Sequence, residues 1–403
     1  MFGLMANDPW LTIIGLGEDG LDGLSLASRL ALEKAEVIMG PSRHLALVST
    51  KASECVEWPI PFHQGISRLL EFRGRTTVVL TSGDPFWFGA GSHIVKNLSF
   101  QEWRAFPAPS TFGWAASNLG WSLEHIAMLG LHAAPISRLR PYLTVGQRLI
   151  VLVRSGKAVH ELANYLTENG FGLSLLFIMQ ALAGSRERIV KVKARNLGKL
   201  EIEKPVCVAI EISGTGRSLG FASGRSNDWF ETDGQISKRP IRALTLSTLA
   251  PQYGEHLWDI GGGSGSISIE WLLLHQSLNA TIIEVNAERA AQIQRNAQQL
   301  GVDHLNVIVG KAPVALHELI LPDAVFVGGG LDQELLNWLI ENVLPGTRLV
   351  INAVTLESEA LLIQAQRGLG GVLMRVGISE QTPIGSRTGW KSSYPVVQWS
   401  VTL

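Results

Sequence analysis

Residues His256–Trp271, HLWDIGGGSGSISIEW, place an apolar strand-like run before a glycine-rich turn and a helix-like run after it. The turn carries a DxGxGxG pattern that starts at Asp259. Glycines let the backbone approach a ligand closely, and the first N–H groups of the following helix carry a partial charge of about +0.5. A dinucleotide fingerprint would need glycine where Ser266 stands. The stretch therefore predicts a nucleotide-type cofactor site of another kind.

An acidic residue follows the glycine turn at the distance expected for a ribose-binding group. The run TIIEVN ends a predicted strand with Glu284. About twenty residues after such a turn, a carboxylate can accept hydrogen bonds from both ribose hydroxyls. Because strand, turn, helix and acid agree, we predict that this half of the chain binds a cofactor that contains a nucleoside.

Residues 235–403 alternate short apolar runs with helical patterns, which predicts parallel βαβ units with right-handed crossovers. The predicted strands are Leu257–Ile260, Ala280–Val285, Asn306–Val309, Ala324–Val327 and Thr347–Ala353, and the predicted helices include Ala287–Leu300 and Gln333–Val343. Two further β-like runs, Val372–Ser379 and Pro395–Val401, have no helical pattern between them. We therefore expect a mostly parallel sheet with a terminal antiparallel strand pair at one edge.

A second strand, glycine turn and helix pattern lies near the start of the chain, in WLTIIGLGEDGLDGLSL, residues Trp10–Leu26. Apolar runs and helical patterns alternate after it, with strands predicted at Leu11–Leu16, Thr76–Ser82, Arg148–Arg154, Leu173–Gln180 and Val206–Ile212. The stretch Ser213–Gln235 is rich in Gly, Ser and charge and has no sustained apolar period. We predict an α/β domain over residues 9–213, a linker over 214–234 and a second α/β domain over 235–403.

The composition argues against several other classes of protein. A net charge of −1, with 46% hydrophobic and 17% charged residues, fits a globular enzyme without a global field that would attract nucleic acid or a membrane surface. The two cysteines, Cys55 and Cys207, make no disulfide framework and no zinc-type CxxC pair, so we expect a reducing cytoplasm. The ten histidines lack metal-ligand spacing, and no metal site is predicted. The most apolar window, Gly170–Gly184, is shorter than the about 20 residues of a membrane helix and is interpreted as a buried strand.

The C-terminal half resembles the Rossmann-type methyltransferases that use S-adenosylmethionine (SAM). Its runs ISKRPIRALTLSTL, GKAPVAL, VFVGGG and INAVTLES resemble the carbon-15 methyltransferase and decarboxylase family of cobalamin biosynthesis, over nearly all of 235–403. By that resemblance, the residues expected to contact SAM are Ser237, Asp259, Gly261, Gly262, Gly263, Ser264, Gly265, Glu284 and Ala312. Two positions depart from the family pattern, since Ser237 stands where relatives often have threonine and Lys311 replaces an acid.

The N-terminal half resembles the tetrapyrrole methylase family. The resemblance rests on TSGDPFWFGAG (Thr81–Gly91), APSTFGWAASNLGW (Ala108–Trp121) and the weaker match QALAGSRERI (Gln180–Ile189). It implies a fold of two α/β subdomains with SAM in the cleft between them. The residues expected at that cofactor site are Gly15, Gly17, Ser82, Gly83, Asp84, Pro85, Gly89, Ser110 and Thr111. Asp84 is equally compatible with a turn and a catalytic role, and Phe86–Phe88 with core packing and a macrocycle-binding wall.

Together the two resemblances imply a bifunctional enzyme with two SAM sites. It is expected to methylate precorrin-6B at carbons 5 and 15 and to remove carbon dioxide from the ring C acetate, which gives precorrin-8X. Both families commonly associate, so a homo-oligomer is expected. No Cys–His or Ser–His–Asp arrangement is present in the sequence motifs, and no catalytic residue is assigned.

The substrate is a polyacid, and two cations lie in the predicted loop IGSRTGWKSSYP. Arg387 and Lys391 are the candidates for holding its carboxylates, and a solvated basic loop is the alternative. Two other functions remain open: another tetrapyrrole methylase fused to an unrelated small-molecule methyltransferase, or an enzyme that methylates RNA or protein. The absence of a basic stripe and of an NPPY-like motif counts against nucleic acid.

Overall fold

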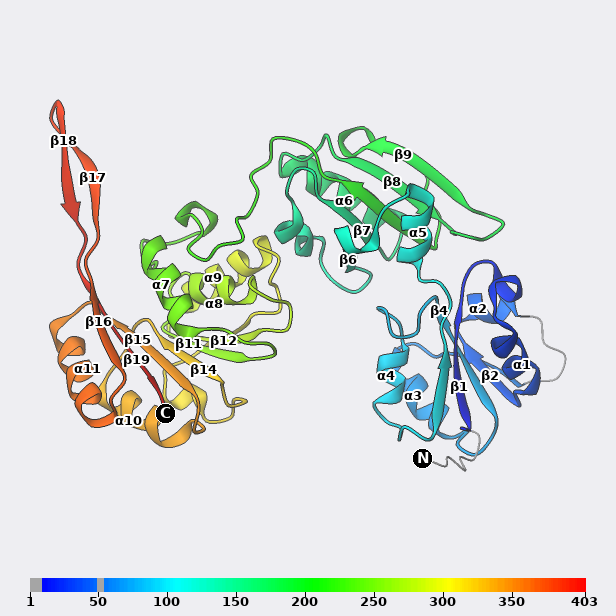
Figure 1. The fold of residues 1–403 in the computed structure, drawn as a ribbon, viewed down its shortest axis with the longest axis horizontal. Coiled ribbons are helices and arrows are strands. Elements are labelled where there is room, and N and C mark those ends of the chain that lie inside the picture. Colours follow the sequence, from blue (N-terminus) through cyan, green and yellow to red (C-terminus); the bar gives the residue numbers. More distant parts are fainter. Residues whose placement is uncertain (1–8, 49–53) are drawn as a thin grey trace. The chain divides into compact units, whose positions relative to one another are not determined.

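The computed structural model describes residues 9–48 and 54–403 and divides into two compact units (Figure 1). Unit 1 comprises Met1–Ile136 and Tyr142–Arg217, and unit 2 comprises Ser137–Pro141 and Ser218–Leu403. None of the helices in the described ranges combines the length and the apolar character needed to cross a membrane.

The first sheet of unit 1 is parallel and has the strand order β3-β2-β4-β1-β5. Its strands are β1 (Leu11–Leu16), β2 (Val37–Gly40), β3 (Glu54–Glu57), β4 (Thr77–Ser82) and β5 (Trp103–Phe106), and its helices are α1 (Leu26–Lys34), α2 (Ser42–Leu47), α3 (Phe62–Leu70) and α4 (Gly91–Val95). All residues of β1 and β2 are buried, as expected for parallel strands covered on both faces. Their carboxyl ends therefore deliver the following loops to one edge of the sheet.

The second sheet of unit 1 is mixed and has the order β6-β7-β10-β8-β9. Its strands are β6 (Ile126–Gly130), β7 (Arg148–Leu152), β8 (Leu175–Gln180), β9 (Arg188–Lys193) and β10 (Val206–Glu211), with helices α5 (Thr111–Leu119) and α6 (Gly156–Glu168). The Ser110 hydroxyl caps α5 by accepting a hydrogen bond from the Gly113 N–H at 3.1 Å. In the apolar window Gly170–Gly184, the strand covers only Leu175–Gln180, because turns flank it on both sides.

The main sheet of unit 2 has seven strands in the order β13-β12-β11-β14-β15-β19-β16. The strands are β11 (His256–Ile260), β12 (Asn279–Glu284), β13 (Asn306–Val309), β14 (Ala324–Val327), β15 (Arg348–Ala353), β16 (Val372–Val376) and β19 (Val396–Thr402). The helices are α7 (Arg239–Leu249), α8 (Ser266–Leu272), α9 (Ala287–Gln299), α10 (Gln333–Asn342) and α11 (Leu356–Leu369). The direction of the strand order reverses between β11 and β14, and ligands of open α/β sheets bind at such a point.

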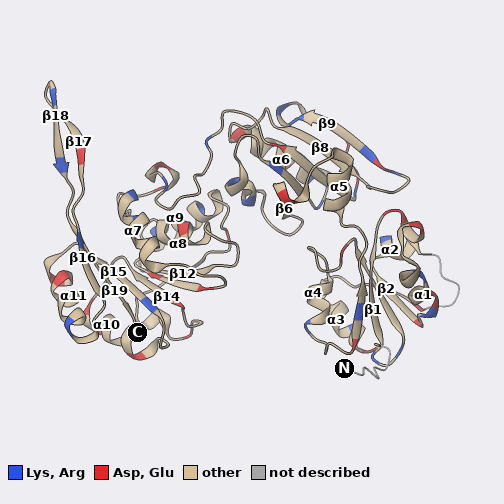
Figure 2. Ribbon diagram, viewed as in Figure 1, with Lys and Arg blue, Asp and Glu red and all other residues tan. Residues whose placement is uncertain are grey.

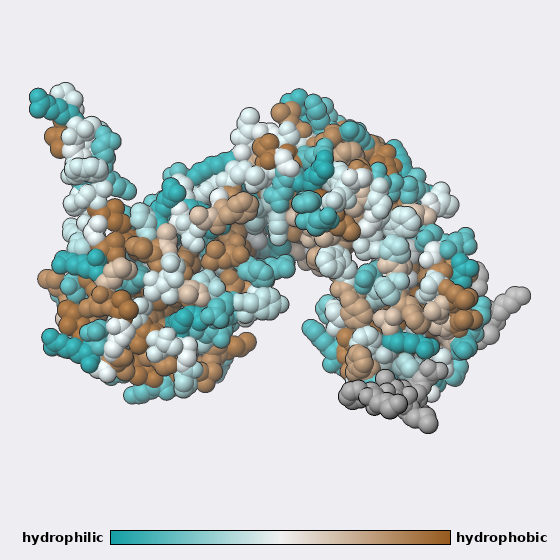
Figure 3. All heavy atoms as spheres, in the orientation of Figure 1, coloured by the Kyte–Doolittle hydropathy of each residue, from teal (hydrophilic) through white to brown (hydrophobic). Residues whose placement is uncertain are grey.

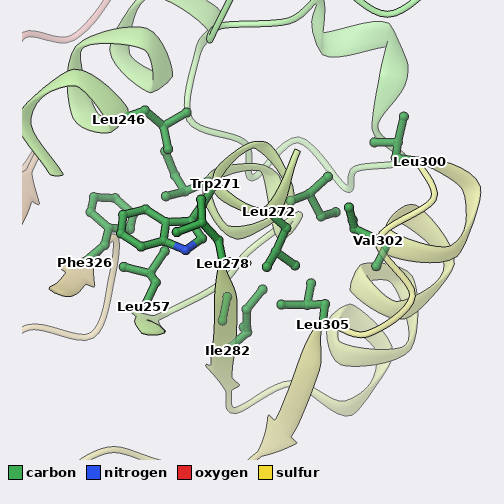
Figure 4. Close-up of a cluster of buried hydrophobic side chains, with 14 of the residues drawn as sticks. Leu246, Leu257, Trp271, Leu272, Leu278, Ile282, Leu300, Val302, Leu305 and Phe326 are labelled. Carbon is green, nitrogen blue, oxygen red and sulfur yellow. The ribbon is translucent and has the colours of Figure 1, made fainter. Parts of the chain in front are cut away.

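Alternate residues of the strands build two separate cores on the two faces of this sheet. Leu257, Ile282 and Phe326 face α7, α8 and α9, where they pack with Trp271 in the cluster of Figure 4. Their strand neighbours, including Trp258, form the core beneath α10 and α11. The expected α/β domain with a mostly parallel sheet is confirmed, and the helices on both of its faces pack on side chains that alternate along the strands.

The chain ends as the sequence indicates, with β16 and β19 paired antiparallel at one side of the sheet. The segment between them differs from the expected loop, because Ser379–Ile384 (β17) and Arg387–Ser392 (β18) pair antiparallel as a separate hairpin. Both β15 and β16 run antiparallel to β19, so β16 delivers the hairpin to the edge where the parallel strands end. The hairpin projects away from the sheet (Figure 1), and its space-filling surface is mostly hydrophilic (Figure 3).

One short segment, which lies between β6 and β7 of unit 1 in the sequence, belongs to unit 2. In Ser137–Pro141, the Arg138 guanidinium donates to both oxygens of Asp303 at 2.7 and 3.0 Å. The Arg140 guanidinium lies 4.6 Å from the centroid of the Trp229 ring. This segment is therefore part of the folded body formed by the C-terminal half.

Candidate cofactor and substrate sites

The glycine loop of unit 2 directly follows β11, at the point where the strand order reverses. Gly261, Gly263 and Gly265 have φ values of 77°, 56° and 75°, a left-handed region in which other residues are strained. A methyl group on Gly261 would lie 2.7 Å from the carbonyl oxygen of Gly329, in the loop after β14. The loop thus needs glycine both for its backbone conformation and for its approach to the neighbouring loop.

Glu284 is the last residue of β12, and its side chain is hydrogen-bonded to the glycine loop. One carboxylate oxygen accepts a hydrogen bond from the Gly263 N–H at 3.0 Å, and the other accepts from the Asn286 N–H at 3.0 Å. The side chain is only 4% exposed. Each oxygen retains a lone pair for a second donor, so the carboxylate is held where two ribose hydroxyls can reach it.

Asp259, at the end of β11, is the most strongly perturbed acid of the site. It is 1% exposed, and its Oδ2 accepts a hydrogen bond from the Ser268 hydroxyl at 2.8 Å. Burial raises the pKa of Asp259 to about 7, and the nearby Glu284 carboxylate adds to this rise. Its Oδ1 and the buried Ser264 hydroxyl have no hydrogen-bond partner among the described residues. Two such atoms beside a glycine loop are the acceptor and donor that a polar, cationic ligand would use.

The remaining predicted contacts border the same edge. The Gly310 N–H donates to the Glu284 carbonyl at 3.0 Å, which brings the loop with Lys311 and Ala312 beside β12. Ala312 is partly buried against the core under α10 and α11. Val285 and Val309, at the ends of β12 and β13, are 66% and 57% exposed. The structure therefore brings the glycine loop, Glu284 and the loop with Ala312 to one edge of the sheet, and the Gln235 carbonyl, 3.1 Å from a Cβ placed on Gly263, brings the segment that leads to Ser237 beside them.

The two predicted substrate cations lie on the hairpin, away from the glycine loop in sequence. Arg387 starts β18, and Lys391 pairs with Glu380 across the hairpin. Figure 2 shows basic segments in blue and acidic segments in red on the two strands of this hairpin. Lys391 lines a hollow of about 620 Å³ at the base of the hairpin, and Arg387 is not among its lining residues. Lys238 lines the same hollow, and its ammonium donates to the Ser393 hydroxyl at 2.6 Å. The sequence reading missed Lys238, which only the fold places beside Lys391.

Five of the nine predicted cofactor residues of unit 1 line a cavity of about 210 Å³. Ser82, Asp84, Gly89, Ser110 and Thr111 are among the residues that line it. The other predicted residues shape the loops around it: Gly15 approaches the backbone of Gly83 and Ala108 so closely that a Cβ would overlap them, Gly17 lies against the Asp19 side chain, and the Pro85 carbonyl lies next to Gly89. The nine predicted residues thus lie at the carboxyl ends of β1 and β4, in the loops that follow these strands, and at the start of α5 after β5.

Asp84 and the aromatic residues after it have distinct positions. The Asp84 Oδ1 accepts a hydrogen bond from the Phe86 N–H at 2.8 Å, so this side chain stabilises the turn. Trp87 and Phe88 line the cavity and are 47% and 51% exposed. Neither ring is fully packed in a core, which leaves apolar surface available to a large flat ligand.

His44 in α2 also lines this cavity, and the sequence reading did not select it. Its Nε2 lies 2.8 Å from a guanidinium nitrogen of Arg43 and 3.2 Å from the Ser82 hydroxyl. Burial and the Arg43 charge lower the pKa of His44 to about 4, so the imidazole is neutral at neutral pH. Its place three residues after Pro41, close behind the end of β2, is the one signal that the sequence offered.

No cluster of His, Cys, Asp or Glu suited to a metal ion occurs within residues 9–48 and 54–403. Both cysteines are free, and Cys207 is buried, which raises the pKa of its thiol to about 12.

Comparison with known proteins gives two matches to protein families. Residues 10–198 match the tetrapyrrole (corrin/porphyrin) methylases, and residues 228–403 match the precorrin methyltransferase domain. A Sinorhizobium protein named precorrin-6Y C(5,15)-methyltransferase (decarboxylating) is 45% identical over 98% of this chain and 96% of its own length.

Two shorter proteins match part of the chain. A Salmonella typhimurium protein named cobalt-precorrin-6B C(15)-methyltransferase (decarboxylating) is 32% identical over 40% of this chain and 85% of its own. The crystal structure of the C-terminal domain of precorrin-6Y C5,15-methyltransferase from Rhodobacter capsulatus is 48% identical, covers 46% of this chain and 100% of its own, and has a TM-score of 0.45.

Proposed function

Since this chain belongs to the family of the decarboxylating precorrin-6Y C5,15-methyltransferases, we propose that its two halves divide the reaction, each with its own SAM site. The chain is a SAM-dependent C-methyltransferase of cobalamin biosynthesis. In the proposed division, residues 9–213 methylate carbon 5, and residues 235–403 methylate carbon 15 and drive loss of carbon dioxide from the ring C acetate. The product of both steps on precorrin-6B is precorrin-8X.

The observation that carries this proposal is the presence of two cofactor-type sites in separate folded units. Unit 2 holds the glycine loop with Glu284 and the unpartnered Asp259 oxygen, and unit 1 holds the cavity lined by Ser82, Asp84 and Thr111. A relative named for carbon 15 alone spans 40% of the chain, which supports the assignment of that carbon to one half.

In unit 2, Glu284 would hold the SAM ribose, and the backbone around Gly261 and Gly263 would contact the rest of the cofactor. Bound SAM supplies an electrophilic methyl group. The buried Asp259 Oδ1 would accept a hydrogen bond from a cationic group of the ligand, and the Ser264 hydroxyl would add a further polar contact. These groups orient the cofactor, and orientation of the reactants alone can lower the activation free energy by about 7–11 kcal/mol.

No strong base from the protein is required at either site. The bridge carbons of a reduced tetrapyrrole are electron-rich, and the conjugated macrocycle can accept the electrons released with carbon dioxide. The neutral His44 and the Ser82 hydroxyl present uncharged polar groups to the cavity of unit 1. Trp87 and Phe88 would cover a face of the macrocycle there.

The direct test of this function is mass spectrometry of the tetrapyrrole after incubation with SAM. Two methyl gains and one loss of carbon dioxide are expected from the full chain, together with two SAM molecules bound per chain by calorimetry. Methylation of an unrelated small molecule or of RNA, with an unchanged tetrapyrrole, would contradict the proposal. One bound SAM with both methylations retained would contradict only the two-site division.

The hairpin supplies a test of substrate binding in the C-terminal half. Replacing both Arg387 and Lys391 with glutamine is expected to lower carbon-15 methylation and decarboxylation together by about two- to thirtyfold, since exposed charge pairs contribute about 0.2–1 kcal/mol each. Carbon-5 methylation and SAM affinity should persist. The measurement is the initial rate of each product by mass spectrometry.

The matched control is Arg367→Gln, which removes an exposed cation of α11 from the last turn of that helix. It should leave all three activities at the level of the unmodified protein. Equal activities in the double variant and the control would assign Arg387 and Lys391 to a solvated surface.

Three further expectations stay predictions. These are the boundaries 9–213, 214–234 and 235–403, assembly as a homo-oligomer, and residence in a reducing cytoplasm, which rests on the two unpaired cysteines. Within the range 214–234, the structure packs Leu219, Trp229 and Phe230 into the core of unit 2.

A further inference from the structure

A group of three charged side chains is buried beside the glycine loop of unit 2. Arg242 of α7 and Glu270 of α8 are 0% exposed, and Arg225 is 7% exposed. The Arg242 Nε donates to a Glu270 oxygen at 2.9 Å, and an Arg225 guanidinium nitrogen lies 3.6 Å from the other oxygen. Two cations share one anion, and burial lowers the pKa of both guanidinium groups.

This group is connected to the chain that leads from unit 1 into α7. The Glu270 carboxylate accepts hydrogen bonds from the Gly224 N–H at 2.6 Å and from the Arg225 N–H at 2.9 Å. The Arg242 guanidinium donates to the Asn227 side chain at 2.9 Å and to the carbonyl oxygens of Arg225 and Ser237. The Arg242 side chain is therefore hydrogen-bonded to residues near both ends of the segment 224–237.

The middle of the same segment is fixed to the glycine loop by a buried amide. The Asn296 side chain of α9 is 0% exposed and donates to the Ser264 carbonyl at 2.9 Å and to the Glu231 carbonyl at 3.0 Å. It also accepts a hydrogen bond from the Glu231 N–H at 2.8 Å. A Cβ on Gly263 would lie 3.1 Å from the Gln235 carbonyl oxygen. Residues 231–237 thus pack against the glycine loop, which is proposed to bind SAM.

Stability alone does not explain this arrangement. A buried cluster of charges is often no more stabilising than apolar side chains of similar volume, because each charge loses its hydration. The Arg242 guanidinium is compensated by carbonyl oxygens and by the Phe230 ring, 5.0 Å from its central carbon, whereas two buried guanidinium nitrogens of Arg225 have no hydrogen-bond partner among the described residues. Directional hydrogen bonds can hold the backbone of residues 224–237 in a single conformation, which apolar packing alone does not do.

We propose that Arg242, anchored by Glu270, is a positioning residue for SAM in the C-terminal half, because it fixes residues 224–237 and the Ser237 contact against the glycine loop. This inference rests on the proposed SAM site of unit 2. It assigns a cofactor-binding role to residues 224–237, most of which the glycine- and serine-rich sequence predicts to be a linker.

The test uses Arg242→Lys in the full-length protein, which keeps the charge but removes the planar fork of donors. We expect the KM for SAM in carbon-15 methylation to rise about tenfold, while kcat falls less than threefold and carbon-5 methylation is unchanged. Calorimetry should show the same loss of affinity at one of two SAM sites. Hydrogen exchange of the backbone N–H groups in residues 224–237 should accelerate at least tenfold.

The control is Arg295→Lys, which alters a surface ion pair to Glu231 of the same segment at 3.0 Å. It should leave SAM affinity and exchange unchanged. A second variant, Asn227→Ala, removes one acceptor of Arg242 at an exposed position and should raise the KM for SAM two- to fivefold, which keeps the test available if Arg242→Lys does not fold.

The outcomes separate this inference from the proposed function. A folded Arg242→Lys protein with a lower melting temperature but unchanged SAM affinity and exchange would overturn the positioning role and leave a structural one. An unchanged KM for SAM in Asn227→Ala would also count against it. If the unmodified protein binds no SAM in its C-terminal half, the proposed function itself is wrong.

Discussion

Asp259→Asn is expected to change how the stability of the protein depends on pH. Burial raises the pKa of this carboxyl to about 7 in the folded protein, against 3.8 for an ordinary aspartate. Between these two pH values the folded state holds a proton that the unfolded state has released. The free energy of unfolding of the unmodified protein therefore loses about 1.4 kcal/mol per pH unit, or about 4 kcal/mol in all, from pH 4 to pH 7. Asparagine does not titrate and removes this loss.

The measurement is the difference in unfolding free energy between Asp259→Asn and the unmodified protein, from urea titrations at several pH values without SAM. This difference should rise with pH up to about pH 7 and then level off. The exposed Asp323, at the other end of the same strands, provides the control Asp323→Asn, which should not reproduce that rise. Parallel curves for Asp259→Asn and the unmodified protein would show that Asp259 is ionised normally.

Glu284→Ala is expected to weaken SAM binding in the C-terminal half by about ten- to a hundredfold. The substitution removes a charged acceptor, which is worth about 1.5–3 kcal/mol to a hydrogen-bonded ligand. It also releases the Gly263 N–H, which the carboxylate holds at 3.0 Å, so the loop loses an internal restraint. Calorimetry on the full-length protein should show one weakened SAM site and one that is unchanged.

Glu288→Ala is the matched control, because Glu288 is an exposed acid in the first turn of α9 and does not contact the glycine loop. It should leave both SAM affinities unchanged. Unaltered affinity at both sites in a folded Glu284→Ala protein would remove Glu284 from the cofactor site.

Much of the fold of the C-terminal half follows from local sequence patterns. The strands over Asn306–Val309 and Ala324–Val327 end where the apolar runs end, and the helix from Ala287 starts behind its Asn286 cap. Ala324–Val327 is buried on both faces and is therefore a continuous apolar run, and the edge strand Asn306–Val309 keeps its valine and isoleucine run although it is partly exposed. Glu284 and the glycine loop were also predictable together, because they lie one βα unit apart.

The β17–β18 hairpin shows where local patterns fail. Its strands are exposed, and β17 contains Pro383, which normally argues against a strand. Neither face of this hairpin packs on a core, so its sequence shows no alternation of apolar and polar residues that would predict the two strands. The strand Arg188–Lys193 was missed as well, although RIVKVK alternates, because it is an exposed edge strand of its sheet.

The sequence by itself determined the two α/β halves, the glycine loops and the family resemblances, because each is encoded by neighbouring residues. Only the tertiary structure placed His44 on the cavity beside Ser82, set Lys238 beside Lys391, and joined Arg242 to Glu270. These pairs are separated by 28 to 153 positions in the chain, so no local period relates them. Their contacts arise from the order in which strands assemble and from the requirement that buried polar groups find partners.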